Sequence, residues 1–349
     1  MTLPLSTFVL IAICGAAGAL AQLLGLPLPY MLGPLLASGL AATAIPHRLP
    51  AFPWLIELRL VFIAVIGLVI GTQVTPELFA QAHALMLSIL ALAVFVLLSV
   101  AWNYTVFRRL GRYDRATAFY SSAPGGLYES IAFGEAAGAD ASRLILQQFL
   151  RVIMVVTFLP IALSIWHGEA VGSAGGMSLA GEHVPLSRLP IIVLAVALGV
   201  GLGRFGRLPA GQLTGPLAIG ALLSLTGLVQ MEIPQWLVNL AQVVVGTALG
   251  MRFTGISPAR LRQAAGLAVV SVGGMLALAA LMASLMAPLT GEGFEVMLIS
   301  FAPGGVTEMA LVALSVPANP ALVTLYHIIR ILMTVLGLTL SARWLKSRL

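Results

Sequence analysis

A proline, two glycines and a glutamate recur together at two places in this chain. Residues 119–130 read FYSSAPGGLYES, and residues 298–309 read LISFAPGGVTEM. The copies lie 179 residues apart in a chain of 349. Proline removes a backbone donor and glycine permits a left-handed backbone, so each copy predicts a break in an otherwise apolar helix. In the hydrocarbon of a membrane, unpaired backbone groups and a carboxylate both raise the free energy of the protein. Their recurrence at such a break therefore indicates a functional site.

The helix that resumes after each Gly-Gly pair would present free N–H groups and a positive dipole end, which suits a carboxylate or another anion. The alternative is a tight hairpin turn that is packed only for structure. Nearby hydroxyl groups would contact a substrate or a cation, or would serve as ordinary interhelical hydrogen bonders. The candidate substrate- and ion-binding residues of the two motifs are Ser121, Pro124, Gly125, Gly126 and Glu129, and Ser300, Pro303, Gly304, Gly305, Thr307 and Glu308.

Each glutamate of the motif has a matching arginine further along the chain. Glu129 and Glu308 would bind a proton or a cation, or would cap the first turn of the helix that follows the break. Arg151 and Arg330 each follow their glutamate by 22 residues and complete the list of candidate binding residues. Each guanidinium group would hold a carboxylate substrate or pair with the glutamate of its own half. The repetition of both partners favours the structural pair.

Two polar positions break the symmetry of the halves. His327 stands where the first half has Gln148, and Tyr326 stands where it has Gln147. A pH-dependent role is open to His327, beside the ordinary role of a hydrogen-bonded histidine between helices.

The composition is that of a membrane protein. Hydrophobic residues make up 60% of the chain and charged residues 9%, whereas soluble domains carry about 25% charged residues. The net charge of +6 comes from basic residues in short connections, so membrane topology explains it better than nucleic acid does. The five histidines do not cluster and Cys14 is alone, so we expect no metal site, no cofactor and no enzyme activity.

The repeat extends beyond the motif and defines the domains. The Gly-x3-Gly pair at 67–71 recurs at 246–250, where we expect close helix packing. The predicted domains are a first repeat at 1–166 with its motif segment at 116–138, an external linker at 167–185, and a second repeat at 186–349 with its motif segment at 294–316. The predicted spans are 3–25, 29–45, 54–74, 82–106, 142–166, 187–204, 212–229, 234–251, 264–287 and 320–342.

Loop charge indicates how the motif segments lie in the membrane. If each segment enters and leaves on the same side, every basic connection and both termini are cytoplasmic. If each segment crosses fully, basic connections fall outside. We therefore predict an all-α polytopic protein of the bacterial inner membrane, with ten transmembrane helices, two re-entrant hairpins and an inverted-topology repeat of five plus five spans. A broken helix that crosses the membrane is the rival geometry.

The paired APGG segments, the duplicated halves and the Glu-x21-Arg spacing resemble the AbrB-duplication family of bacterial membrane proteins. Members carry labels such as ammonia monooxygenase and regulator of gene expression, and no residue here supports either chemistry directly. In topology only, the arrangement is similar to the sodium–glutamate and sodium–citrate symporters, which place Gly-Gly re-entrant loops from opposite sides between the fourth and fifth spans. Their motif is not reproduced outside the Gly pair, so their substrates and coupling ion do not carry over.

These features predict a secondary transporter of a small anionic or zwitterionic metabolite, coupled to H⁺ or Na⁺, with its site at the paired APGG segments. The alternative is a membrane-embedded ligand sensor that regulates gene expression without net transport. The expected partners are the lipid bilayer, the small-molecule substrate, and H⁺ or Na⁺. The pattern leaves room for a homodimer and predicts no direct binding of nucleic acid.

Overall fold

The computed structural model describes residues 4–45, 53–76, 82–168, 170–171, 184–208, 210–227, 231–316 and 318–346. Within these ranges the regular elements are helices, and eight of them are long and apolar enough to cross a membrane. The chain is thus a helical, multi-pass membrane protein. Most of the predicted linker at 167–185 lies outside the described residues.

The helix bounds follow the sequence repeat. The helices of the first half are α1 (Pro4–Leu23), α2 (Pro29–Ala44), α3 (Pro53–Thr72), α5 (Ala82–Arg109), α6 (Arg115–Ser121), α7 (Leu127–Ala136) and α8 (Ala141–His167). Those of the second half are α9 (Leu189–Phe205), α10 (Gly211–Thr226), α11 (Gln235–Gly250), α12 (Pro258–Thr290), α13 (Phe294–Phe301), α14 (Val306–Leu314) and α15 (Pro320–Lys346). The starts of α6, α7 and α8 match those of α13, α14 and α15 at the offset of 179 residues.

Two of the ten predicted spans are short helices. Helices α2 and α10 have 16 residues each, which is about 24 Å at 1.5 Å per residue and less than the hydrocarbon thickness of about 30 Å. Helix α11 also has 16 residues, but a 3-10 turn extends its apolar span to Phe253. The other eight predicted spans correspond to the eight long apolar helices of the described ranges. The total of ten spans therefore stays a prediction.

The helices divide into two compact units, and each unit draws on both halves of the sequence. Unit 1 consists of Met1–Ala80, Leu159–Ile256 and Ala310–Ala321, and unit 2 of Gln81–Phe158, Ser257–Met309 and Leu322–Leu349. Unit 1 thus contains α1, α2 and α3 with α9, α10 and α11. Unit 2 contains both Pro-Gly-Gly breaks together with α5, α12 and most of α8 and α15.

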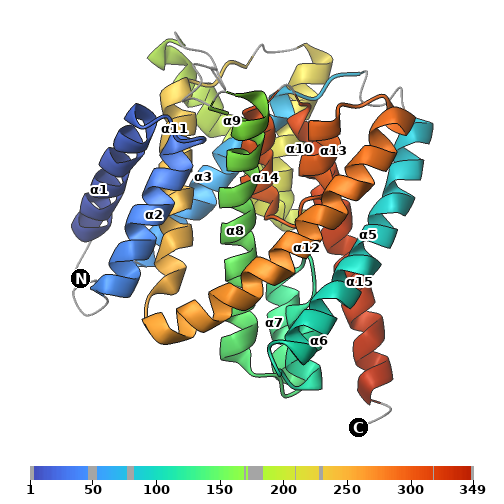
Figure 1. Ribbon diagram of the computed structural model, residues 1–349. Coiled ribbons are helices and arrows are strands. Elements are labelled where there is room, and N and C mark those ends of the chain that lie inside the picture. The colour runs from blue at the N-terminus through green and yellow to red at the C-terminus, as the bar shows by residue number, and fades with distance from the viewer. Residues whose placement is uncertain are drawn as a thin grey trace. The chain divides into compact units, whose positions relative to one another are not determined.

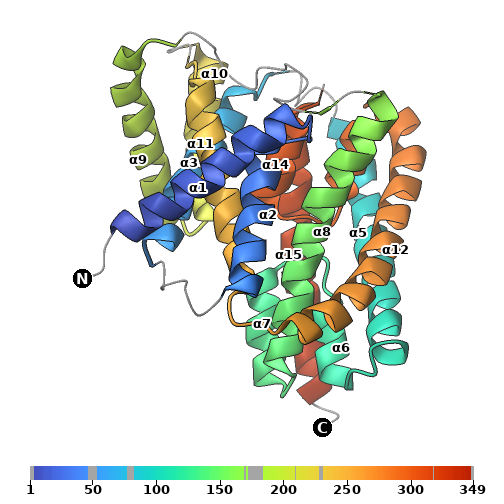
Figure 2. The ribbon, with the colours of Figure 1, turned by 60° about the vertical axis from the view of Figure 1, so that its left-hand side comes forward.

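Glycines bring helix backbones into contact in unit 1. Helix α10 packs against α3 and α9, and α11 packs against α2 (Figures 1 and 2). A Cβ added at Gly71 of α3 would lie 2.9 Å from the Cα of Gly220 in α10. One added at Gly250 of α11 would lie 2.7 Å from the backbone nitrogen of Gly39 in α2. Both Gly-x3-Gly pairs are therefore close-packing sites, as predicted.

Aromatic rings surround the second break in unit 2. Helix α12 runs beside α5 and also contacts α13 (Figure 1). The ring of Phe301, at the end of α13, lies 5.8 Å from that of Phe95 in α5 and 6.2 Å from that of Tyr326 in α15. All three side chains are buried. The break after Phe301 is therefore enclosed by apolar packing, where polar backbone groups need protein partners.

Candidate functional site

The first break separates α6 from α7. Helix α6 begins after Asp114, whose side chain accepts a hydrogen bond from the backbone N–H of Thr117 at 2.9 Å, as an N-cap does. It ends at Ser121, and α7 starts after Gly126. Gly126 has φ +60°, a left-handed conformation that glycine adopts without the steric cost of a side chain. The predicted interruption is thus a short non-helical segment around Pro124.

The second break separates α13 from α14 with a different backbone. Gly305, the counterpart of Gly126, is not among the glycines with positive φ. A Cβ added at Gly305 would instead collide with the carboxylate of Glu308. Glycine is therefore required for conformation at the first break and for space at the second.

Both breaks meet on one stretch of α15. A Cβ added at Gly125 would lie 3.3 Å from Thr334 Oγ1, and one added at Gly126 would lie 3.1 Å from Val335 Cγ2. From the second half, Arg330 donates to the carbonyl oxygens of Ala302 and, at 2.7 Å, Gly304. Residues 330–335 of α15 therefore touch both breaks. All of these residues belong to unit 2.

The two arginines bind backbone carbonyls. Arg151 donates from Nη1 to the carbonyl of Ala123, and Arg330 makes the equivalent bond to Ala302. Among the described residues, neither guanidinium group contacts a carboxylate, so the Arg–Glu pairing favoured by the repetition is replaced by arginine–carbonyl bonds. The physical reason is that a break leaves carbonyls without helical partners, and buried carbonyls need donors.

These arginines are also buried cations with unused donors. Arg151 is 6% exposed and Arg330 is 0% exposed. The Nε of each is buried and has no hydrogen-bond partner in the part of the chain that the structure describes. Arg151 and Arg330 both belong to unit 2, and each donates to the carbonyl of the alanine before the proline of its break. Two buried cations with free N–H donors beside the two breaks suit an anion.

Gln148 is a residue of this site that sequence reasoning did not identify. Its Nε2 lies 3.1 Å from the carbonyl oxygen of Tyr120, 3.4 Å from that of Ser121 and 3.3 Å from that of Ala123. It therefore shares the Ala123 carbonyl with Arg151. The available signal was its position three residues before Arg151, which places both side chains on one face of α8.

The two glutamates lie over the first turns of their helices. Glu308 is buried, and its carboxylate lies above Gly305 at the start of α14. Glu129 is half-buried in the first turn of α7, with Oε2 3.4 Å from the position of a Cβ on Gly126. This placement is the one expected of carboxylates that stabilise a helix start. The ion-binding interpretation of the two residues stays a prediction.

The hydroxyl groups differ in how they are used. Ser300 Oγ donates to the carbonyl of Val296 in its own helix at 2.7 Å. Ser121 Oγ is buried without a hydrogen-bond partner within the described ranges. Thr307 is buried at the start of α14. Of the predicted hydroxyl ligands, Ser300 is thus engaged within its own helix, whereas Ser121 keeps a buried hydroxyl that is unused by the described residues.

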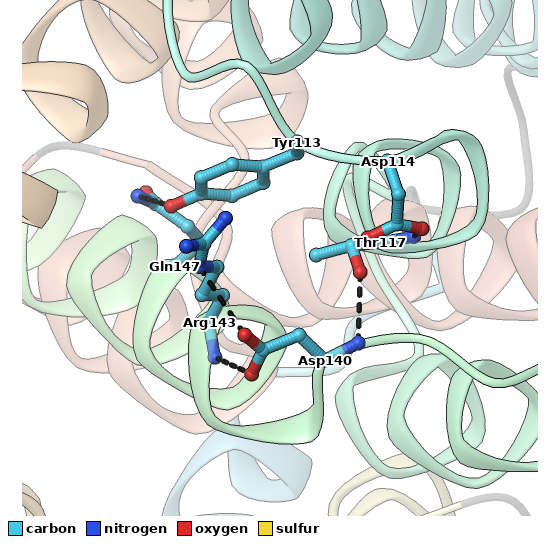
Figure 3. Close-up of polar contacts among 6 residues, drawn as sticks. All are labelled: Tyr113, Asp114, Thr117, Asp140, Arg143 and Gln147. Atoms are coloured by element: carbon cyan, nitrogen blue, oxygen red, sulfur yellow. Dashed lines mark hydrogen bonds and ion pairs between the residues drawn. The ribbon is translucent and has the colours of Figure 1, made fainter.

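A polar cluster connects the start of α6 to α8 (Figure 3). The backbone N–H of Asp140 donates to Thr117 Oγ1 at 2.8 Å, and Arg143 pairs with Asp140 at 3.2 Å. Arg143 also lies 5.2 Å from the centre of the Tyr113 ring. Gln147 Nε2 donates to the Tyr113 hydroxyl at 3.0 Å, and burial, the largest influence, raises the pKa of that hydroxyl. These contacts fix the position of the start of α6 relative to the helix that carries Arg151.

The fold and these contacts define a polytopic membrane protein with a polar, positively charged centre inside one helical unit. Residues 30–346 match the AbrB family, which is described as "Transition state regulatory protein AbrB", and the chain belongs to that family.

Two relatives extend along almost the whole chain. "Putative regulator AbrB" of Escherichia coli (strain K12) is 25% identical over 323 residues, which cover 92% of this chain and 91% of that protein. "Uncharacterized protein YhjN" of Bacillus subtilis (strain 168) is 24% identical over 344 residues, which cover 93% of this chain and 89% of that protein.

Proposed function

We propose that this protein is a secondary transporter of a small anionic or zwitterionic metabolite, coupled to H⁺ or Na⁺, with its site at the two Pro-Gly-Gly breaks. The observation that carries the proposal is the meeting of both breaks on residues 330–335 of α15. Transporters built from inverted repeats bind substrate where interrupted helices of the two halves come together. Alternating access would come from movement of one part of the repeat bundle against another.

The buried arginines favour an anionic group on the substrate. An unpaired buried charge costs several kcal/mol on the order-of-magnitude scale for protein interiors. Arg151 and Arg330 are both buried, and their Nε donors have no partner in the described ranges. A carboxylate or phosphate between them would offset both charges and accept both N–H groups. The free hydroxyl of Ser121 would add a further polar contact.

Helix length supports the re-entrant geometry of the proposal. Helices α6, α7, α13 and α14 have 7, 10, 8 and 9 residues. At 1.5 Å per residue none exceeds about 15 Å, half of a hydrocarbon layer of about 30 Å. Two such hairpins, ten spans, inverted halves, cytoplasmic termini and a location in the bacterial inner membrane together form the proposed topology. The proposal assigns the chain no catalytic step and no cofactor.

Transport by the purified protein in proteoliposomes tests this proposal. Radiolabelled glutamate, succinate, citrate and inorganic phosphate would be offered under H⁺ and Na⁺ gradients. We expect at least one to accumulate, and Arg330→Gln or Arg151→Gln to reduce uptake about tenfold or more, since each removes a charge-assisted contact. Arg109→Gln, at the exposed end of α5, is the matched control and should transport normally. Unchanged uptake in both buried-arginine variants would contradict the proposed site.

A ligand sensor is the second candidate, and the name of the Escherichia coli relative favours it. Such a protein would bind its ligand at the same polar centre without moving it across the membrane, and would act through a cytoplasmic partner. Ligand-dependent thermal stabilisation without any flux in proteoliposomes would favour the sensor over the transporter.

A further inference from the structure

Three side chains beside the first break carry buried polar atoms without a hydrogen-bond partner in the described part of the chain. The atoms are Ser121 Oγ, Gln148 Oε1 and Arg151 Nε. Each of the three residues is more than nine-tenths buried. Buried polar groups in native proteins are nearly always paired, so atoms that the protein leaves unpaired point to a bound ligand or to water.

The three residues converge on one backbone segment. Arg151 Nη1 donates to the carbonyl of Ala123, and Gln148 Nε2 lies 3.3 Å from the same oxygen. Gln148 Nε2 also lies 3.4 Å from the carbonyl oxygen of Ser121. Arginine Nε is bonded to the same carbon as Nη1, and glutamine Oε1 to the same carbon as Nε2. The unpaired atoms of Arg151 and Gln148 therefore lie beside the atoms that share the Ala123 carbonyl.

The unpaired atoms are of opposite kinds. Gln148 Nε2 lies within 3.4 Å of three carbonyl oxygens, so this atom must be the NH₂ group of the amide, and Oε1 is an acceptor. Arg151 Nε can only donate, and the Ser121 hydroxyl can donate or accept. A plain anion would satisfy Arg151 but would leave Gln148 Oε1 without a donor. The set is complementary to a ligand that both accepts and donates.

We propose that Ser121, Gln148 and Arg151 form a subsite that recognises a hydrogen-bond donor beside the anionic group of the substrate. The carboxylate accepts from Arg151, and a hydroxyl or amino group on the next carbon donates to Gln148 Oε1. The Ser121 hydroxyl adds a bond to either group. The inference rests on the proposed function and narrows its substrate to a carboxylate with a hydroxyl or amino group on the adjacent carbon. Gln148 is then a specificity-determining residue.

Burial makes this recognition selective. A substrate analogue without the donor would cover Gln148 Oε1 with a C–H group, and the buried oxygen would stay unpaired. Sites that hydrogen-bond a substrate hydroxyl or amino group reject the analogue that lacks it more strongly than an apolar pocket rejects a missing methylene. We therefore expect the analogue to bind about tenfold more weakly, or worse.

Isothermal titration calorimetry of the purified protein in lipid nanodiscs tests the inference with matched acids. Each set contains an acid with its 2-hydroxy and 2-amino derivatives: propionate, lactate and alanine; succinate, malate and aspartate; glutarate, 2-hydroxyglutarate and glutamate. In at least one set, a derivative should bind about tenfold or more tightly than the unsubstituted acid. The inference is overturned if no set shows this preference, whether because water fills the subsite and the acids bind equally or because none binds.

Two substitutions assign the preference to the subsite. Gln148→Met removes Oε1, so the derivative and the unsubstituted acid should bind with similar Kd. Ser121→Ala removes a hydroxyl without a described partner, so the fold should persist while the preference falls. Gln147→Met is the matched control, because Gln147 Oε1 is also unpaired within the described ranges but its Nε2 contacts the Tyr113 hydroxyl. An unchanged preference in both subsite variants would contradict the inference.

Flux of the same radiolabelled acids in proteoliposomes separates this inference from the proposed function. Tight binding of a derivative without flux of any acid would contradict the transporter and leave the recognition of the donor standing. Transport and binding of an unsubstituted acid as good as those of its derivatives would contradict the inference and leave the transporter standing. Preferential binding and flux of one derivative, both reduced in Gln148→Met, is the result expected if both hold.

Discussion

Arg330 donates a hydrogen bond of 2.7 Å to the carbonyl oxygen of Gly304, between the two glycines of the second break. The same guanidinium group also binds the carbonyl of Ala302, on the other side of Pro303. One side chain thus donates to a carbonyl on each side of the proline, and the Ala302 carbonyl also accepts from the N–H of Gly304 at 2.9 Å. This explains how a break in a helix is tolerated in the interior of a membrane protein.

Loss of Arg330 should destabilise the protein more than loss of Arg151. Arg330→Met leaves the buried Gly304 carbonyl without its donor, whereas the Ala302 carbonyl keeps the N–H of Gly304, and the expected cost is about 1–3 kcal/mol. Arg151→Met removes one bond, and Gln148 still donates to the same carbonyl of Ala123, so the cost should be about half as large. Thermal unfolding in detergent measures both, with the exposed Arg109→Met at the end of α5 as the control. Equal destabilisation by the two buried substitutions would contradict this explanation.

The two glycine pairs should respond differently to alanine. Gly126→Ala places a side chain at φ +60°. This backbone strain should lower the free energy of unfolding by about 1 kcal/mol, independently of the neighbouring side chains. Gly305→Ala pushes a Cβ against the Glu308 carboxylate. Adding Glu308→Ala should therefore relieve Gly305→Ala, with a coupling energy of about 1 kcal/mol or more in a double-mutant cycle. Glu129→Ala should give no such relief to Gly126→Ala, and relief of similar size in both pairs would refute the distinction.

Low pH should weaken the N-cap that Asp114 provides at the start of α6. Burial acts to raise the pKa of Asp114, but hydrogen bonds from Thr117 and neighbouring backbone N–H groups outweigh it and lower that pKa below its ordinary value of 3.8. Because the folded value is the lower one, the stability from this carboxylate is present above about pH 4 and is lost as the pH falls through the folded value. Asp114→Ala should cost about 1 kcal/mol at neutral pH.

The measurement for this N-cap is thermal stability as a function of pH. Asp114→Asn keeps a capping oxygen but cannot titrate, so its stability should fall less steeply than that of the unsubstituted protein below about pH 4. Identical acid profiles of the two proteins would show that the cap does not contribute.

Close helix contacts in unit 1 should not accept a methyl group. Gly71→Ala and Gly250→Ala each place a Cβ within 3 Å of a neighbouring helix backbone, so we expect each to cost about 1–3 kcal/mol. Gly273→Ala in α12 meets nothing within 4 Å and is the matched control. It should be neutral or stabilising by up to about 1 kcal/mol through helix propensity. Thermal unfolding would contradict the packing argument if all three substitutions had the same effect.

Single cysteines test the re-entrant geometry. In a Cys14→Ser background, Ala136→Cys at the end of α7 should react with an impermeant reagent from the cytoplasmic side. Gly293→Cys, before α13, should react from outside. Labelling of position 136 from outside would mean that the first motif segment crosses the membrane, and the rival geometry would then replace the hairpin.

Sequence alone predicted the local architecture well. The Pro-Gly-Gly residues predicted the two breaks, and α6 and α13 end within a few residues of them. Eight of the ten predicted spans correspond to long apolar helices of the described residues. These features could be predicted because proline and glycine alter the backbone where they occur, and because a long apolar run determines locally whether a helix can span the membrane.

The hydrogen-bond partners of the two arginines could not be predicted from the sequence. Repetition paired Arg151 and Arg330 with Glu129 and Glu308, yet in the structure both donate to carbonyls near the breaks. Every residue has a backbone carbonyl, so the residue types do not show which carbonyl an arginine will bind. A pattern of side-chain charges therefore could not predict these bonds. Gln148 was missed for the same reason, because its three acceptors are also carbonyls.

The sequence by itself therefore determined that this is a membrane protein of two matching halves, each with one interrupted helix, a nearby glutamate and a distant arginine. Only the tertiary structure decided that both interruptions lie in one unit and meet on α15, and that both arginines donate to carbonyls beside them. The physical reason is distance along the chain. Periodicity and backbone chemistry are local, whereas the donor that a buried carbonyl receives depends on which side chain is nearest in space.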